Sequence, residues 1–121
     1  LSNMPCVKYD IQNPYGSKQN SPFNSQNTFL AREVIPYYMV IPHVGRMDDI
    51  WGSYIIQDMF PDSVIYHKPT VYQDRNEQDL VTNLEKEIIG YRNTLDFIMG
   101  AYDLEELPQR AYDLYRQQFD V

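Results

Sequence analysis

The sequence predicts an α/β fold in which a short mixed sheet carries flanking helices and a C-terminal helical extension. Three observations predict it. The chain has 121 residues and an apolar content of 43%, which suits a single domain that buries a core. Apolar residues recur at helical spacing from Leu80 to Ile98. Short β-branched and aromatic runs, bounded by turn residues, lie upstream at 28–31 and 63–67.

Charge and composition exclude several classes of protein. Ten Lys and Arg against seventeen Asp and Glu give a net charge of −7, which repels a phosphate backbone, so nucleic-acid binding is not expected. The longest uncharged apolar stretch, 34–44, is too short for a bilayer and contains Pro36 and Pro42, so no membrane span is expected. The single cysteine, Cys6, cannot form an internal disulfide, which favours a reducing, cytoplasmic compartment.

The N-terminal part is predicted to be mostly loop. Residues 2–27 are rich in Asn, Gln, Ser, Pro and Gly, and only a short piece around 6–9 is typical of extended backbone. Turn residues and aromatic side chains within this segment favour an ordered loop over a cleft. A short buried strand is predicted over 28–31. One or two helical turns follow over 32–38, before prolines force extended backbone.

A buried helix is predicted after the turn at 45–47. Asp48 and Asp49 fall at its start, where carboxylates cap free amides and favour the positive end of the helix dipole. The run 50–60 is apolar on more than one side, which indicates a helix covered by other elements. Pro61 ends it.

A kinked edge strand and two further helices are predicted downstream. Residues 63–67 and 70–72 are β-branched and aromatic, which favours a strand interrupted by a proline. Asn76 and Asp79 resemble a capping box that opens a helix. Pro108 is expected at the first position of the last helix. The helix that follows the capping box carries an apolar stripe over about five turns, formed by Leu80, Leu84, Ile88, Tyr91, Leu95 and Ile98.

Two neighbouring carboxylates form the most informative cluster. Asp48 and Asp49 repel each other, which raises the proton affinity of one of them, and such a carboxylate can accept a hydroxyl proton. The pair therefore predicts a general base. The alternative is that Asp48 only caps the helix and Asp49 faces solvent. Trp51 and Tyr54 nearby would offer a stacking surface for a sugar ring, or would pack in the core as aromatic residues at helical spacing often do.

The second candidate is the segment 24–28, which we call the polar loop. It places Asn24, Ser25, Gln26, Asn27 and Thr28 before the predicted strand, and such a run can read several hydroxyl groups at once. The alternative is turn chemistry, in which Asn and Ser bond their own backbone.

The two histidines of the chain do not lie at metal-ligand spacing, and no Asp-x-Asp or Gly-rich phosphate loop occurs, so the residues indicate no metal site.

Three blocks, in this order, resemble a glycosyltransferase-like family. They are Ser21-Pro22-Phe23-Asn24-Ser25-Gln26-Asn27-Thr28, then Gly45-Arg46-Met47-Asp48-Asp49-Ile50-Trp51, then Pro69-Thr70-Val71-Tyr72-Gln73-Asp74-Arg75-Asn76 with Asn83-Leu84-Glu85-Lys86-Glu87. The chain is similar to the C-terminal half of the STELLO-type proteins of plants and their microbial relatives. More distantly it resembles the reversibly glycosylated polypeptides, the UDP-arabinopyranose mutases, which carry a similar Gly-Arg-x-Asp-Asp-x-Trp. The blocks span roughly residues 14–91.

This resemblance implies a partial GT-A-like glycosyltransferase fold. An acceptor-side α/β part would occupy 1–76, and a C-terminal helical extension packed on it would occupy 77–121. The implied partners are a nucleotide-sugar and a sugar or protein acceptor, and a eukaryotic relative would face the Golgi lumen. The uridine-binding half with its Asp-x-Asp is absent from this chain, so a divalent ion, Mn²⁺ or Mg²⁺, is expected only through an upstream segment.

The resemblance also assigns roles to individual residues. Asp49 is implied as the general base, and Asp48 as an acceptor contact or a group that tunes its neighbour. Arg46 would contact a phosphate or hold the carboxylates in place. The sugar pocket would be bordered by Asn24, Gln26 and Asn27. Gln73 stands where the mutases have a histidine, so a metal or phosphate contact is not carried over to it.

Three functions remain open from the sequence. The first is the acceptor-side half of a glycosyltransferase. The alternative is a non-catalytic binding or scaffold module that reuses the fold, and the third is an unrelated helical interaction domain built on the stripe within 80–98. A sheet lacking its other half would leave the strand at 28–31 with an unpaired edge, which favours assembly into an oligomer.

Overall fold

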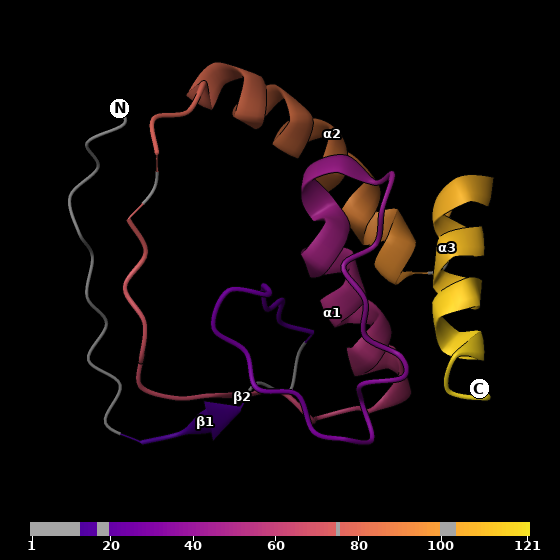
Figure 1. Cartoon of the computed structure of the whole chain (residues 1–121). Coiled ribbons are helices and arrows are strands. Elements are labelled where there is room, and N and C mark those ends of the chain that lie inside the picture. Colours follow the sequence, from indigo (N-terminus) through magenta and orange to yellow (C-terminus); the bar gives the residue numbers. More distant parts are fainter. Residues whose placement is uncertain (1–12, 17–19, 75, 100–103) are drawn as a thin grey trace.

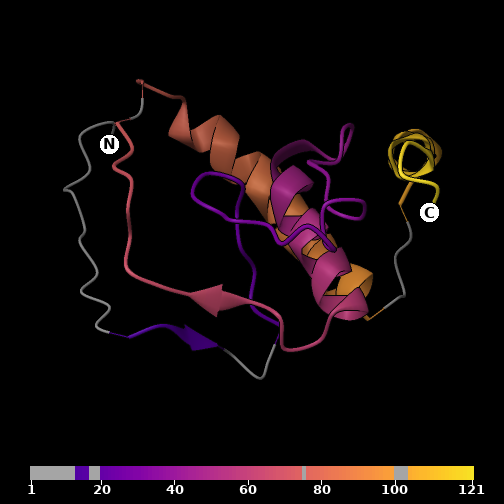
Figure 2. The same cartoon turned by 60° about the horizontal axis from the view of Figure 1, so that its bottom comes forward.

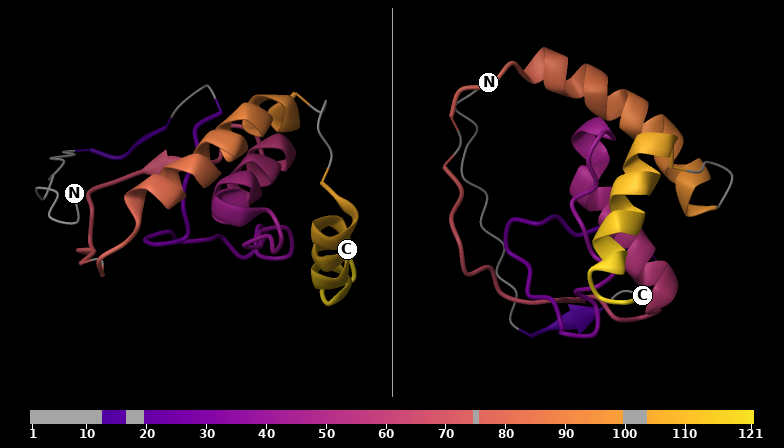
Figure 3. Two further views of the ribbon diagram at one scale, coloured as in Figure 1. Left: turned by 90° about the horizontal axis from the view of Figure 1, so that it is seen from above. Right: turned by 45° about the vertical axis from the view of Figure 1, so that its right-hand side comes forward.

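Three α-helices and a two-stranded sheet make up the regular structure of the described residues, which are 13–16, 20–74, 76–99 and 104–121 of a computed structural model. Helix α1 lies in the middle, α2 packs beside it, and α3 stands at one side (Figures 1 and 3). The elements are β1 (Tyr15–Gly16), the short 3-10 helix η1 (Gly45–Met47), α1 (Asp48–Met59), β2 (Ile65–Tyr66), α2 (Leu80–Ile98) and α3 (Glu106–Gln117).

The sheet is smaller than the mixed sheet that the sequence predicts. Strands β1 and β2 pair antiparallel, with Tyr15 opposite Tyr66 and Gly16 opposite Ile65. The rings of Tyr15 and Tyr66 have their centroids 5.4 Å apart, a cross-strand aromatic contact that stabilises the pair. From β2, an extended segment runs to the start of α2 along the side of the molecule away from α3 (Figures 1 and 2).

The strands predicted over 28–31 and 70–72 do not form. Both segments lack regular secondary structure, and Phe29 is 94% exposed. An aromatic or β-branched run becomes a strand only where a neighbouring strand takes up its backbone hydrogen bonds. In the described sheet, β1 and β2 pair with each other, and neither of these two segments joins them. The predicted turns over 32–38 are present, with the Val34 N–H donating to the Ala31 carbonyl at 2.9 Å. The extended piece predicted over 6–9 lies outside the described residues.

The core forms where η1 and α1 meet α2. Ile41, Met47 and Trp51 are buried together. The Trp51 ring stacks on the Phe97 ring of α2, with centroids 4.6 Å apart and planes within 10° of each other. The prediction of a helix that starts at Asp48 and is covered on several sides is confirmed, because the buried residues of α1 are Trp51, Gly52, Ser53, Ile56 and Gln57.

Helix α2 begins later than the predicted capping box. Asp79, and not Asn76, is its N-cap, and the Asp79 carboxylate accepts hydrogen bonds from the Thr82 N–H at 3.1 Å and the Thr82 hydroxyl at 2.7 Å. Both bonds lower the pKa of Asp79, and the bond from the Thr82 hydroxyl has the larger effect. The capping pair is three residues apart, as predicted, but it consists of Asp79 and Thr82 and not of Asn76 and Asp79.

The predicted apolar stripe of α2 does not face the core. Leu84, Tyr91 and Leu95 are exposed, whereas Gly90 is buried. A Cβ atom on Gly90 would lie 2.3 Å from Met47 Cγ, so the bare backbone of Gly90 is what admits the Met47 side chain. The helix therefore docks through a small residue, and its apolar stripe points elsewhere.

Helix α3 is held by tyrosine hydroxyls. Tyr112 donates to the Tyr37 carbonyl at 2.8 Å, and Tyr115 donates to the Ile35 carbonyl at 2.6 Å. Pro108 is the third residue of this helix and not the first, a position within the first turn that still needs no intrahelical N–H donor. None of the helices in the described part of the chain is long and apolar enough to cross a membrane.

Candidate functional site

The chain just upstream of the polar loop is fixed by a buried glutamine of α1. The Gln57 amide accepts a hydrogen bond from the Ser21 N–H at 2.9 Å and donates one to the Ser21 carbonyl at 2.8 Å. The Tyr66 hydroxyl of β2 lies 2.8 Å from Ser21 Oγ and 2.9 Å from the Pro22 carbonyl. A single amide thus satisfies both backbone groups of Ser21, which sets where the loop leaves the core.

Asp49 fixes the middle of the same loop. Its Oδ2 atom accepts hydrogen bonds from the Ser25 N–H at 3.0 Å and from the Ser25 hydroxyl at 3.2 Å. The sequence places these residues 24 positions apart, and the structure brings them into direct contact. Because Asp49 sits in the first turn of α1, its negative charge is also favoured by the helix dipole.

Asp48 bonds to its own helix. Its Oδ1 atom accepts from the Asp49 N–H at 2.8 Å, and its backbone carbonyl accepts from the Ile41 N–H at 3.2 Å. The side chain therefore satisfies one of the free amides at the start of α1. Asp48 is the first residue of α1 and Met47 is its N-cap, so Asp48 helps to satisfy the start of the helix without occupying the cap position.

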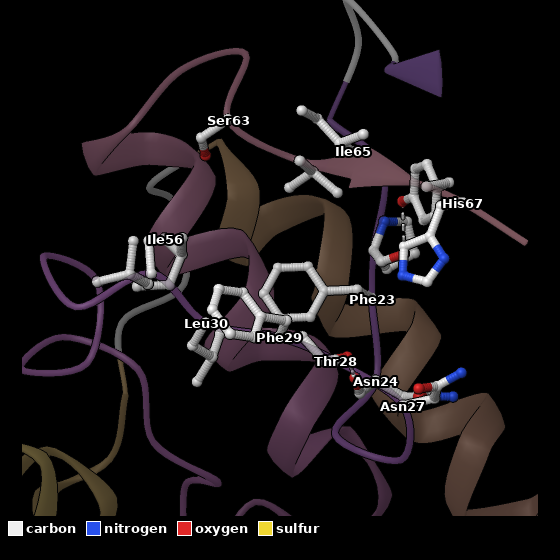
Figure 4. Close-up of a pocket in the computed structure, with 15 residues that line it drawn as sticks. Phe23, Asn24, Asn27, Thr28, Phe29, Leu30, Ile56, Ser63, Ile65 and His67 are labelled. Atoms are coloured by element: carbon white, nitrogen blue, oxygen red, sulfur yellow. Dashed lines mark hydrogen bonds between the residues drawn. The ribbon is translucent and has the colours of Figure 1, made fainter. Parts of the chain in front are cut away.

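A cavity of about 600 Å³ opens between the polar loop and β2. Its walls are mostly apolar, and Figure 4 shows the side chains of Phe23 and Leu30 in the middle of the lining residues and Ile56 at one side. Asn24 and Asn27 lie together at one end of the group, away from Ile56 (Figure 4). The cavity is lined by Pro22, Phe23, Asn24, Asn27, Thr28, Phe29, Leu30, Ala31, Val34, Ile56, Ser63, Val64, Ile65, Tyr66 and His67.

The amides of the polar loop divide into two kinds. Asn24 bonds its own backbone, since its Oδ1 atom accepts from the Gln26 N–H at 3.1 Å, which is the turn chemistry that the sequence also allows. Asn27 instead accepts from the Thr70 hydroxyl at 3.1 Å, across to the segment that follows β2. Both line the cavity, whereas the Gln26 side chain does not. The polar loop therefore offers two amides to this cavity.

Two residues singled out from the sequence lie elsewhere. Arg46 pairs with Glu87 of α2, Nη2 to Oε1 at 3.0 Å, and so ties η1 to α2. Trp51 is 3% exposed and donates from its indole nitrogen to the Thr94 hydroxyl at 3.0 Å. Its ring faces Phe97 and not the cavity, so the alternative in which Trp51 packs in the core describes this structure. Tyr54 is partly buried, and burial raises the pKa of its hydroxyl.

Tyr38 carries an unusual hydroxyl close to the two acids. Its side chain is 8% exposed, its ring lies 5.5 Å from the Phe23 ring, and the buried hydroxyl has no hydrogen-bond partner among the described residues. Burial raises the pKa of Tyr38 to about 12, and the negative charges of Asp49 and Asp48 add to this. Neither Tyr38 nor Gln57 is predicted by motif spacing. The one available signal for Gln57 is a lone amide within an apolar helix.

Neither a metal-binding cluster in the described residues nor a comparison with known proteins identifies the family. In the described ranges, histidine, cysteine and carboxylate side chains do not gather in a group of three that could hold a metal ion. Comparison of the chain with protein-family models, curated proteins and solved structures finds no match. The site itself therefore carries the functional argument.

Proposed function

We propose that the chain binds a saccharide in the cavity beside the polar loop, as the acceptor-side part of a nucleotide-sugar-dependent glycosyltransferase. The observation that supports this is the pairing of an aromatic and aliphatic wall with two amides, Asn24 and Asn27, in one cavity of about 600 Å³. A sugar ring has apolar C–H faces and a rim of hydroxyl groups, and it needs both kinds of surface. The volume lies within the range usual for small-molecule pockets.

In this proposal Asp49 is the general base. Its carboxylate removes the proton of an acceptor hydroxyl while that oxygen forms a bond to the anomeric carbon of the donor. The bond between the anomeric carbon and the nucleoside diphosphate breaks, and the diphosphate leaves with the electron pair. Ser25 fixes Oδ2 of Asp49 by two hydrogen bonds, which holds the carboxylate at the edge of the polar loop. Asp48 is the neighbouring carboxylate in the first turn of α1.

A second candidate is a saccharide-binding module without catalysis. One observation favours it: Asp49 is not among the residues that line the cavity. Its hydrogen bonds to Ser25 then serve only to position the polar loop. Both candidates share the same cavity and differ in whether Asp49 touches a reacting hydroxyl.

Binding is tested by titrating the ¹⁵N-labelled chain with a panel of mono- and oligosaccharides and of UDP- and GDP-sugars. We expect shifts in the amides of 22–31 and 63–67, and about tenfold weaker binding in Asn27→Ala, because a lost hydrogen bond that leaves a polar group unpaired costs about 1 to 3 kcal/mol. Thr70→Val serves as the control, since it removes the partner of Asn27 but keeps the amide. If saccharides leave these amides unmoved, the shared proposal is wrong.

Catalysis is tested with the same donors and acceptors by following release of nucleoside diphosphate. Asp49→Asn is expected to abolish transfer, whereas Asp58→Asn, the same change at an exposed position of α1, is expected to leave it intact. Transfer that survives in Asp49→Asn contradicts the role of this residue as base. Saccharide binding without transfer in the unmodified chain would support the non-catalytic candidate.

A further inference from the structure

The exposed part of the apolar stripe of α2, which is Leu84, Ile88, Tyr91 and Leu95, forms together with Val81 a row with the spacing of a helix-pairing seam. Its members alternate in steps of three and four, which is the a/d pattern of two helices packed side by side. Each is largely exposed: Val81 65%, Leu84 54%, Ile88 42%, Tyr91 63% and Leu95 65%. The first half of α2 also extends past α1, with no other helix alongside it (Figures 1 and 3).

The charges beside this stripe are arranged for a second copy of the same helix. Glu85 and Arg92 are both exposed, and each directly follows an apolar stripe residue, so both lie along the same edge. When two α2 helices run antiparallel, Leu84 faces Leu95 of the other copy and Ile88 faces Tyr91. The same two-fold axis places Glu85 of each copy beside Arg92 of the other, so both charges meet an opposite charge twice.

The opposite edge of the stripe argues against a parallel pair. A parallel arrangement would set Arg92 against Glu87 of the other copy. Glu87, however, is already paired with Arg46 of its own chain at 3.0 Å and faces η1. Glu85 and Arg92 lie on the edge away from that contact, and an antiparallel pair joins this edge to itself.

We propose that the chain forms a two-fold symmetric dimer through antiparallel packing of α2 on α2, with the stripe Val81, Leu84, Ile88, Tyr91 and Leu95 as its seam and two Glu85–Arg92 ion pairs at its edge. Burial of five large apolar side chains per copy supplies the driving force, since each loses contact with water. The ion pairs select the antiparallel direction more than they add affinity.

Analytical ultracentrifugation over a range of concentrations tests the dimer. The unmodified chain is expected to show a concentration-dependent dimer, and Leu84→Asp is expected to be monomeric at every concentration reached. Because Leu84 is exposed, Leu84→Asp should retain the helical circular dichroism of a dilute, monomeric sample of the unmodified chain. A chain that stays monomeric up to millimolar concentration overturns the proposal.

Charge reversal tests the direction. Glu85→Arg and Arg92→Glu are each expected to weaken the dimer by about threefold to tenfold, because two exposed ion pairs, each of modest strength, become repulsive. The double variant should restore the original affinity. Glu106→Arg, the same change on α3, is the control. If Glu85→Arg has no effect, or if the double variant stays weak, the antiparallel seam is wrong. These outcomes do not depend on saccharide binding, so either proposal can fail alone.

Discussion

The environment of α1 and the stripe of α2 show two opposite relations between sequence pattern and burial. Within α1, the two buried polar side chains each have a partner: Ser53 donates to the Ile50 carbonyl, and Gln57 bonds the backbone of Ser21. On α2, Leu84 and Leu95 form a regular apolar stripe and remain exposed. Gly90, which lies on another face of α2, is buried against Met47 instead. Complementary shape, more than hydrophobicity alone, selects which face of a helix docks.

Removing one large aromatic side chain from each region tests whether the two regions differ in burial. Trp51→Ala is expected to lower the free energy of unfolding by about 3 to 5 kcal/mol, because it leaves a cavity beside Phe97 and removes the hydrogen bond to Thr94. Tyr91→Ala should lower it by less than about 0.5 kcal/mol in the monomer. Urea unfolding of dilute samples measures both. Equal losses would mean that the two regions are not different in burial.

The second prediction concerns the contact that orients α2. Gly90→Ala should lower the free energy of unfolding by about 1 to 3 kcal/mol, because the added methyl overlaps Met47. In a Met47→Ala background the overlap is gone, and the same change should instead raise it by up to about 1 kcal/mol through the better helix propensity of alanine. A double-mutant cycle by urea unfolding measures both steps. The idea fails if Gly90→Ala has the same sign in the two backgrounds.

The smallest expected effect belongs to the unpartnered hydroxyl near the polar loop. Tyr38→Phe should raise the free energy of unfolding by about 1 kcal/mol at pH 7, because it removes a buried polar group without a hydrogen bond. The pKa of about 12 adds a pH dependence. Below pH 10 both states keep the phenolic proton, whereas between pH 10 and 12 only the unfolded state loses it, so the stability of the unmodified chain falls there.

Tyr38→Phe lacks that titration, and its advantage should therefore widen from pH 7 to pH 11. Urea unfolding at the two pH values measures the difference, and ultraviolet difference absorbance follows the phenol itself. Titration of Tyr38 near its ordinary value, or a loss of stability in Tyr38→Phe at pH 7, would contradict the buried position of this hydroxyl.

The helices follow from local sequence. Acids at a helix start, a proline at the end of α1 and the spacing within 80–98 act between near neighbours, so they predict the helices and the bounds of α1. The first residues of α2 and α3 differ from the predicted ones. Strands need partners far along the chain. For that reason the runs at 28–31 and 70–72, which have strand-forming residues, are loops in the structure.

The candidate site divides in the same way. Asp49 and the polar loop are recognised as chemistry-bearing residues from their types alone. Their contact through Ser25 is a tertiary fact, as is the wall that β2 contributes to the cavity. Arg46 and Trp51 look equally suited to a site in the sequence. Each finds its partner on α2, because a distant element can satisfy a charge or cover a ring that local spacing leaves open.

Local sequence patterns therefore account for the helices, the placement of two acids at the start of α1 and the polar character of the loop before it. Only the tertiary structure decided that the loop closes onto Asp49, that Gly90 and not the apolar stripe packs against Met47, and that the stripe is left exposed. The two kinds of interaction act over different distances along the chain. Helix propensity and capping act over one or two turns, whereas burial and hydrogen bonding across the fold depend on which surfaces fit together.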